Sequence, residues 1–173
     1  MQILKMAMVI LVIVSFAVLA ISNTHLKNLA DGVKADKILV RKKDNILELY
    51  SDGILLKSYP VSFGANPSGH KIQEGDERTP EGLYEIDRKN PESGFYLSLH
   101  VSYPDSNDIQ IAQQSGVNPG GLIMIHGMRN RFGWIGKLHR FINWTDGCIA
   151  VTNREMDEIW RAVDNGTQIE ITP

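Results

Sequence analysis

The sequence predicts a single, mainly β domain with a few short helices, preceded by an apolar leader. The chain has 173 residues, 43% of them hydrophobic, which is the length and composition of one ordinary domain. Short runs rich in β-forming residues begin at Lys37 and are separated by turns of Gly, Asn and Asp. A clear helical stripe comes only near the C-terminal end, so repeated βαβ units are not expected.

The first segment, residues 1–22, is predicted to direct export. Lys5 is followed by sixteen residues, 6–21, in which Ser15 is the only polar side chain. A basic start before an apolar run is typical of a secretory signal peptide or an N-terminal membrane anchor. The run is slightly shorter than a full span of about 20 residues, and both alternatives stay open. Residues 23–36 are polar and aperiodic, which predicts a linker, so the domain proper is expected at 37–173.

Strands dominate the first part of the domain. Closely spaced β runs are expected at 38–40, 46–50 and 54–63, then at 83–86 and 95–103, and in an apolar strand that ends at His126. The first three predict an antiparallel meander, in which Pro60 indicates an edge strand or a bend. A turn-rich stretch occupies 64–82, and 105–115 predicts a short helix that ends at Gly116.

A helix and a final strand close the predicted domain. Thr152 and Glu155 match a capping box, in which both side chains satisfy free N–H groups at a helix start. Apolar residues then recur with helical spacing at Met156, Ile159, Trp160 and Val163. A strand is expected over 167–172.

Cys148 is the only cysteine in the sequence. Structural cysteines of exported proteins usually occur in pairs, so a lone thiol there is an inert buried residue, an intermolecular disulfide or a nucleophile. His126 follows an apolar strand, and a thiol with an imidazole in reach can carry nucleophilic acyl transfer. Gly147 permits close approach of a substrate, and the amides of Gly147 and Cys148 are candidate oxyanion donors.

These motifs carry a resemblance to a known family. The segments I-H-G at 125–127 and T-D-G-C-I-A-V at 145–151 resemble the signature of L,D-transpeptidase catalytic domains, the YkuD-like family. The stretch G-D-E-R-T-P-E-G-L-Y-E-I at 75–86 resembles their Thr-Pro-x-Gly region. The run from Asp146 to Trp160 resembles an exported Gram-negative murein branch. The resemblance covers roughly residues 37–172 and implies a YkuD-like β-sandwich or open barrel.

The resemblance also implies a chemistry and a location. Cys148 would attack a diaminopimelate carbonyl in a peptidoglycan stem peptide and form a thioester, which an amine of a second stem or water then resolves. His126 matches the general base, and Gly127 is the glycine of the His-Gly signature. Gly147 and Cys148 match the oxyanion hole, and Thr145 matches the Ser/Thr position. No metal or cofactor is implied. The location would be the periplasm, with membrane contact through the N-terminal segment.

Asp146 departs from the family pattern, which often has histidine there. A carboxylate beside the nucleophile would raise the thiol pKa unless a nearby cation offsets its negative charge. Arg129, Arg131 or Arg140 could do so, or Asp146 could orient His126.

Other candidate residues surround this centre. Arg129 and Arg131 are possible partners of stem-peptide carboxylates. Trp144 and His100 are possible walls of a substrate groove, with packing as the alternative for each. His139 is expected on a short helix with a surface or core role.

Several function classes are disfavoured or stay as alternatives. With 18 basic and 20 acidic residues the chain shows no basic face for nucleic acid, and one cysteine with scattered histidines does not match zinc-ligand spacing. The leading expectation is a cysteine L,D-transpeptidase. An L,D-specific hydrolase that cleaves crosslinks or protein–peptidoglycan links, and a non-catalytic wall-binding module, are the alternatives.

Overall fold

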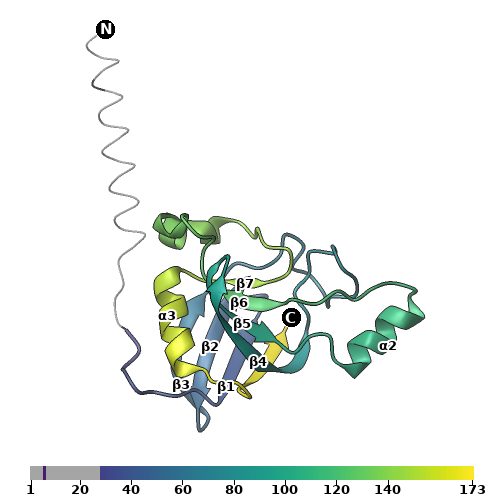
Figure 1. Ribbon diagram of the computed structural model, residues 1–173, viewed down its shortest axis with the longest axis horizontal. Coiled ribbons are helices and arrows are strands. Elements are labelled where there is room, and N and C mark those ends of the chain that lie inside the picture. Colours follow the sequence, from purple (N-terminus) through teal and green to yellow (C-terminus); the bar gives the residue numbers. More distant parts are fainter. Residues whose placement is uncertain (1–5, 7–27) are drawn as a thin grey trace.

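The computed structural model describes residues 6 and 28–173, which fold around one curled sheet (Figure 1). Eight strands form this sheet: β1 (Lys37–Arg41), β2 (Ile46–Ser51), β3 (Ile54–Pro60), β4 (Gly82–Ser93), β5 (Tyr96–Val101), β6 (Met124–His126), β7 (Ile149–Ala150) and β8 (Gln168–Thr172). Their order across the sheet is β3-β2-β1-β8-β4-β5-β6-β7. The prediction of a mainly β single domain is confirmed.

The first three strands form the predicted antiparallel meander, with β3 at the edge of the sheet. The third strand stops at Pro60, three residues earlier than expected, because proline cannot continue the ladder. β1 also pairs in parallel with β8, from Lys37 beside Gln168 to Arg41 beside Thr172. The last strand of the chain therefore lies in the middle of the sheet.

The second half departs from a simple meander. β4 runs for 12 residues, well beyond the predicted 83–86, with irregular pairing to β5 that bends the strand. β6 and β7 pair in parallel, Ile125 beside Ile149 and His126 beside Ala150. A parallel pair needs a long crossover, which the chain between residues 127 and 148 supplies.

The sheet curls until its two edge regions meet. Ser62, just after β3, exchanges two backbone hydrogen bonds with Ala150 in β7, at 3.0 and 2.8 Å. Gly64 forms a second bridge with Thr145. The segment after β3 thus lies directly beside the Cys148 turn, which gives the open-barrel shape that the resemblance implied.

Three short helices in the described part of the chain accompany the sheet: α2 (Ser106–Gln114), η1 (Gly133–Phe141) and α3 (Asn153–Ala162). The predicted capping box of Thr152 and Glu155 starts α3, and its apolar stripe buries Met156 and Ile159 completely. α3 packs against β5, whereas α2 projects from the far end of the molecule (Figure 1). η1 is a 3-10 helix broken at Gly136, where φ is +54°.

The predicted export segment, residues 1–22, lies outside the described residues apart from Met6. Of the predicted linker, the described part from residue 28 runs along the domain: Ala35 belongs to the core, and its N–H donates to the Ala162 carbonyl at 2.9 Å. No helix in the described ranges is long and apolar enough to cross a membrane.

Candidate active site

Cys148 and His126 line the same open pocket, which has a volume of about 1070 Å³. In the parallel pairing of β6 and β7, His126 lies beside Ala150, two positions after Cys148. Cys148 immediately precedes β7, which is Ile149–Ala150, so the thiol and the imidazole come from neighbouring segments of the chain and both line the pocket.

The turn from Thr145 to Cys148 is held by its own hydrogen bonds. The Thr145 hydroxyl donates to the Cys148 carbonyl at 2.7 Å and accepts from the Gly147 N–H at 3.3 Å. Gly147 has φ of +120°, and a Cβ there would lie 2.5 Å from the Arg78 carbonyl oxygen. Only glycine fits this position, which explains the glycine before the nucleophile candidate.

The loop behind this turn fixes its central peptide. Thr79 is completely buried, and its hydroxyl donates to the Gly147 carbonyl at 2.8 Å. The Lys42 ammonium in turn binds the Thr79 carbonyl at 3.0 Å and the Glu81 carboxylate at 2.7 Å. In a trans peptide the C=O and the N–H point in opposite directions. The bond from Thr79 therefore turns the Cys148 N–H away from the loop.

The Cys148 thiol is held in its protonated form. It donates to the Leu122 carbonyl at 3.5 Å, and Leu122 has a left-handed φ of +57°, which is uncommon for a branched residue. Burial raises the pKa of Cys148 and Asp146 raises it further, while Lys71 lowers it. The expected effect of Asp146 is thus present, but the cation that opposes it is Lys71.

The arginines that were expected to offset the charge of Asp146 do not pair with it. Arg140 donates to both carboxylate oxygens of Glu155, at 2.5 and 2.6 Å, and the ion pairs of the described residues include none from Asp146 to Arg129 or Arg131. Asp146 is an exposed residue at the pocket wall.

His126 is buried and neutral. Its Nδ1 lies 2.6 Å from the carbonyl oxygen of Gly127, which can only accept, so Nδ1 carries the proton and Nε2 is left as the basic atom. Gly127, not Asp146, therefore orients the ring. Burial lowers the pKa of His126, partly opposed by this hydrogen bond. Phe95 and Trp144 enclose the ring, with centroids 4.6 and 5.9 Å away.

The remaining predicted residues divide into two groups. Arg129, Trp144 and Thr145 line the pocket with the cysteine and the histidine. His100 and Arg131 are not among the lining residues. His100 instead binds the Asp87 carboxylate at 2.6 Å, so the expectation that it walls the groove is not met.

The pocket also contains residues that the sequence did not single out. Lys71, Glu74 and Phe95 line it. His139, which was expected on a short helix, lies in η1 and also lines the pocket; it is buried and interacts with the Ser62 hydroxyl at 3.1 Å. Burial, with Arg140 nearby, lowers the pKa of His139 to about 4, so it stays neutral. No sequence signal marked Lys71, because its position depends on the fold of the 64–82 loop.

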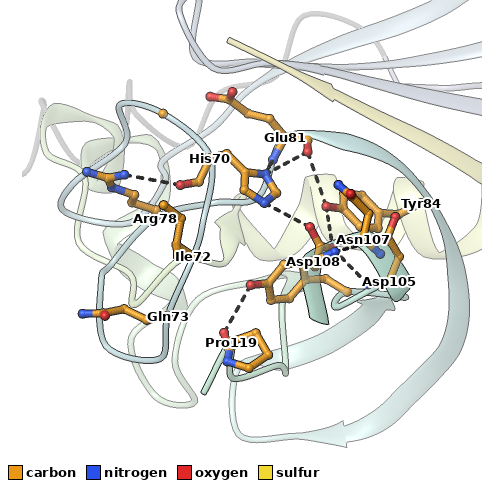
Figure 2. A network of polar contacts seen from close by, with 12 residues as sticks. His70, Ile72, Gln73, Arg78, Glu81, Tyr84, Asp105, Asn107, Asp108 and Pro119 are labelled. Carbon is orange, nitrogen blue, oxygen red and sulfur yellow. Dashed lines mark hydrogen bonds and ion pairs between the residues drawn. The ribbon is translucent and has the colours of Figure 1, made fainter. Parts of the chain in front are cut away.

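His70 connects that loop to α2 (Figure 2). Its Nδ1 accepts from the Glu81 N–H at 3.0 Å, and its Nε2 lies 3.0 Å from the buried Asp108 carboxylate. Tyr84 donates to the other oxygen of Asp108 at 3.0 Å. This network holds one wall of the pocket, because Lys71 is the next residue after His70.

In the described ranges, no cluster of three or more His, Cys, Asp or Glu side chains could hold a metal ion. The pocket lining combines the Cys148 thiol and the His126 imidazole with charged side chains that include Lys71, Glu74 and Asp146.

Comparison with known proteins identifies the class. The L,D-transpeptidase catalytic domain family, YkuD, matches residues 35–171, and the chain belongs to this family. YafK of Escherichia coli strain K12, whose name assigns it to the L,D-transpeptidases, is 27% identical over 172 residues, 92% of this chain and 62% of that protein. YkuD of Bacillus licheniformis is 30% identical over 142 residues, which cover 79% of this chain and 66% of that protein.

A solved structure supports the Gram-negative branch of the family. The helical cell shape determining protein Pgp2 of Campylobacter jejuni superimposes with a TM-score of 0.61 and 26% identity, over 88% of this chain and 53% of its own. The chain thus spans between about half and two thirds of the length of the relatives it matches.

Proposed function

We propose that this chain is an exported cysteine acyltransferase, an L,D-transpeptidase that acts on peptidoglycan stem peptides. The observation that carries the proposal is the placement of Cys148, just before β7, and of the neutral His126, at the end of β6, in the lining of one pocket, within a chain of the L,D-transpeptidase family.

In this mechanism Nε2 of His126 takes the thiol proton, and the Cys148 sulfur attacks the diaminopimelate carbonyl. The C–N bond to the terminal D-alanine breaks, and the imidazolium returns its proton to the leaving amine. A thioester remains on Cys148. An amine of a second stem attacks it, His126 removes the extra proton, and the free thiol is restored with a new crosslink. The Cys148 N–H stabilises the oxyanion in both steps.

The raised thiol pKa and lowered imidazole pKa fit a resting pair that is uncharged. Such a pair exchanges its proton only when a carbonyl occupies the pocket, which protects an exported thiol from oxidation between turnovers.

The test is turnover of purified tetrapeptide stems, followed by mass spectrometry. Cys148→Ala and His126→Gln are expected to abolish product formation with unchanged thermal unfolding. His100→Gln, a histidine outside the pocket, is the matched control and should keep turnover. Dimeric products support transfer, and loss of existing links without dimers indicates the hydrolase instead. A Cys148 that neither turns over stems nor is acylated by a carbapenem would indicate a wall-binding module and refute the enzyme.

A further inference from the structure

The connection from Met128 to Thr145, which contains η1, exposes a group of large apolar side chains. Phe141 is 82% exposed, Ile142 67%, Trp134 61% and Phe132 44%. Ile142 and Phe132 also line the pocket, so substrate could cover them, but Phe141 and Trp134 do not. The two most exposed aromatic rings of this segment therefore lie outside the pocket lining.

The same segment is basic. It contains four basic residues and no acidic one, in a chain whose formal net charge is −2. Arg140 is engaged with Glu155, whereas Arg129 and Arg131 are exposed beside the apolar group. Exposed Trp and Phe with flanking Arg and Lys are typical of segments that lie in the interface of an anionic bilayer.

The position of η1 in the fold gives a reason for a membrane there. Arg140 of η1 binds Glu155 in the first turn of α3, and the neighbouring Arg154 donates to the Asn28 side chain at 2.7 Å. Asn28 is therefore at the same end of the molecule as η1. It follows residue 22, the end of the apolar leader, by six residues, which span at most about 22 Å.

We propose that the η1 face, which we define as Phe132, Trp134, Phe141 and Ile142 with Arg129 and Arg131, docks on the surface of the anionic bilayer that holds the leader. This rests on the proposed export and on retention of the leader as a membrane anchor, and it adds a second contact with the bilayer. The leader tethers the domain to the bilayer, and the η1 face orients the domain on its surface. The catalytic pocket then opens along the membrane surface, because Phe132 and Ile142 belong both to the pocket lining and to the η1 face.

The test uses the full, uncleaved chain in vesicles of phosphatidylethanolamine and phosphatidylglycerol with brominated acyl chains, which quench tryptophan at the bilayer. The chain has three tryptophans, none of them in residues 1–27. Wild type is expected to be quenched, and Trp134→Phe is expected to lose most of that quenching. Phe141→Ser should reduce it in the same way.

Ile54→Ser is the matched control, since Ile54 is 69% exposed but lies at the β2–β3 turn, at the opposite end of the molecule (Figure 1). Replacing phosphatidylglycerol with phosphatidylcholine should weaken quenching in wild type. The docking is overturned if Trp134→Phe keeps the wild-type quenching, or if quenching does not depend on lipid charge. Equal effects of Ile54→Ser and Phe141→Ser would overturn it as well. Carbapenem acylation of Cys148 in the same vesicles reports on the proposed function separately, because neither Trp134 nor Phe141 lines the pocket.

Discussion

Thr79→Val tests how the oxyanion donor is positioned. The Thr79 hydroxyl is the buried donor to the Gly147 carbonyl, at 2.8 Å, and valine has nearly the same shape without the hydroxyl. The substitution leaves a buried carbonyl without this partner, which costs about 1–3 kcal/mol. The Gly147–Cys148 peptide then loses the bond that sets the direction of the Cys148 N–H.

The expected loss in rate follows from the role of that N–H. Complete removal of an oxyanion donor lowers kcat by about 10²–10³. A peptide that is loosened keeps part of this stabilisation, so we expect acylation of Cys148 to fall by about ten-fold to a hundred-fold. Thr79→Ser retains the hydroxyl and should restore most of the rate.

Two reactions of the same thiol separate positioning from general damage. Acylation by a carbapenem passes through an oxyanion, whereas alkylation by iodoacetamide does not. Thr79→Val should slow acylation, measured by mass spectrometry of the intact protein, and leave alkylation near the wild-type rate. Equal slowing of both reactions, or wild-type acylation in the valine variant, would refute the reasoning.

Three further substitutions test the site and its support. Asp146→Asn should lower the pKa of Cys148, because a raising charge is removed, and so shift the pH profile of iodoacetamide alkylation to lower pH; an unmoved profile contradicts this. Gly147→Ala should abolish acylation and lower the melting temperature, since its Cβ would lie 2.5 Å from the Arg78 carbonyl oxygen, and a stable, active variant would disprove the clash. Burial raises the pKa of Glu155, but its arginine and threonine partners outweigh this effect and hold the pKa below its usual range. The ionised Glu155 therefore stabilises the folded state at pH values above its unfolded-state pKa, and this stabilisation is lost as pH falls through its folded-state pKa. The melting temperature should therefore fall less between pH 7 and pH 3 in Glu155→Gln than in wild type.

Local signals in the sequence predicted much of the fold. The capping box at Thr152 places the start of α3 because its bonds join residues three apart. Pro60 ends β3 through its missing N–H. Cys148 and His126 were predicted for a similar reason, since each belongs to a short motif next to a strand, and the pairing of β6 with β7 places both in the lining of one pocket.

Other features depend on residues far apart in the sequence. His70 meets Asp108 across 38 positions, and no local pattern indicates that pair. Lys71 lines the pocket because Asp76 holds the loop, accepting from the Lys71 ammonium and the N–H of Ile72 at 2.8 Å each. The arginines expected beside Asp146 have long side chains with many possible partners, and Arg140 is bound by Glu155 instead.

The parallel pairing of β1 with β8 makes the order of synthesis matter. β8 lies between β1 and β4, so no ladder joins the two halves of the sheet until residues 168–172 are available. A chain that emerges from its N-terminus first leaves one edge of β1 and one of β4 unpaired during that time, and unpaired edges are templates for association with other chains. The domain can therefore complete its fold only after β8 has been synthesised. Loss of the last six residues would remove a central strand, not a terminal extension.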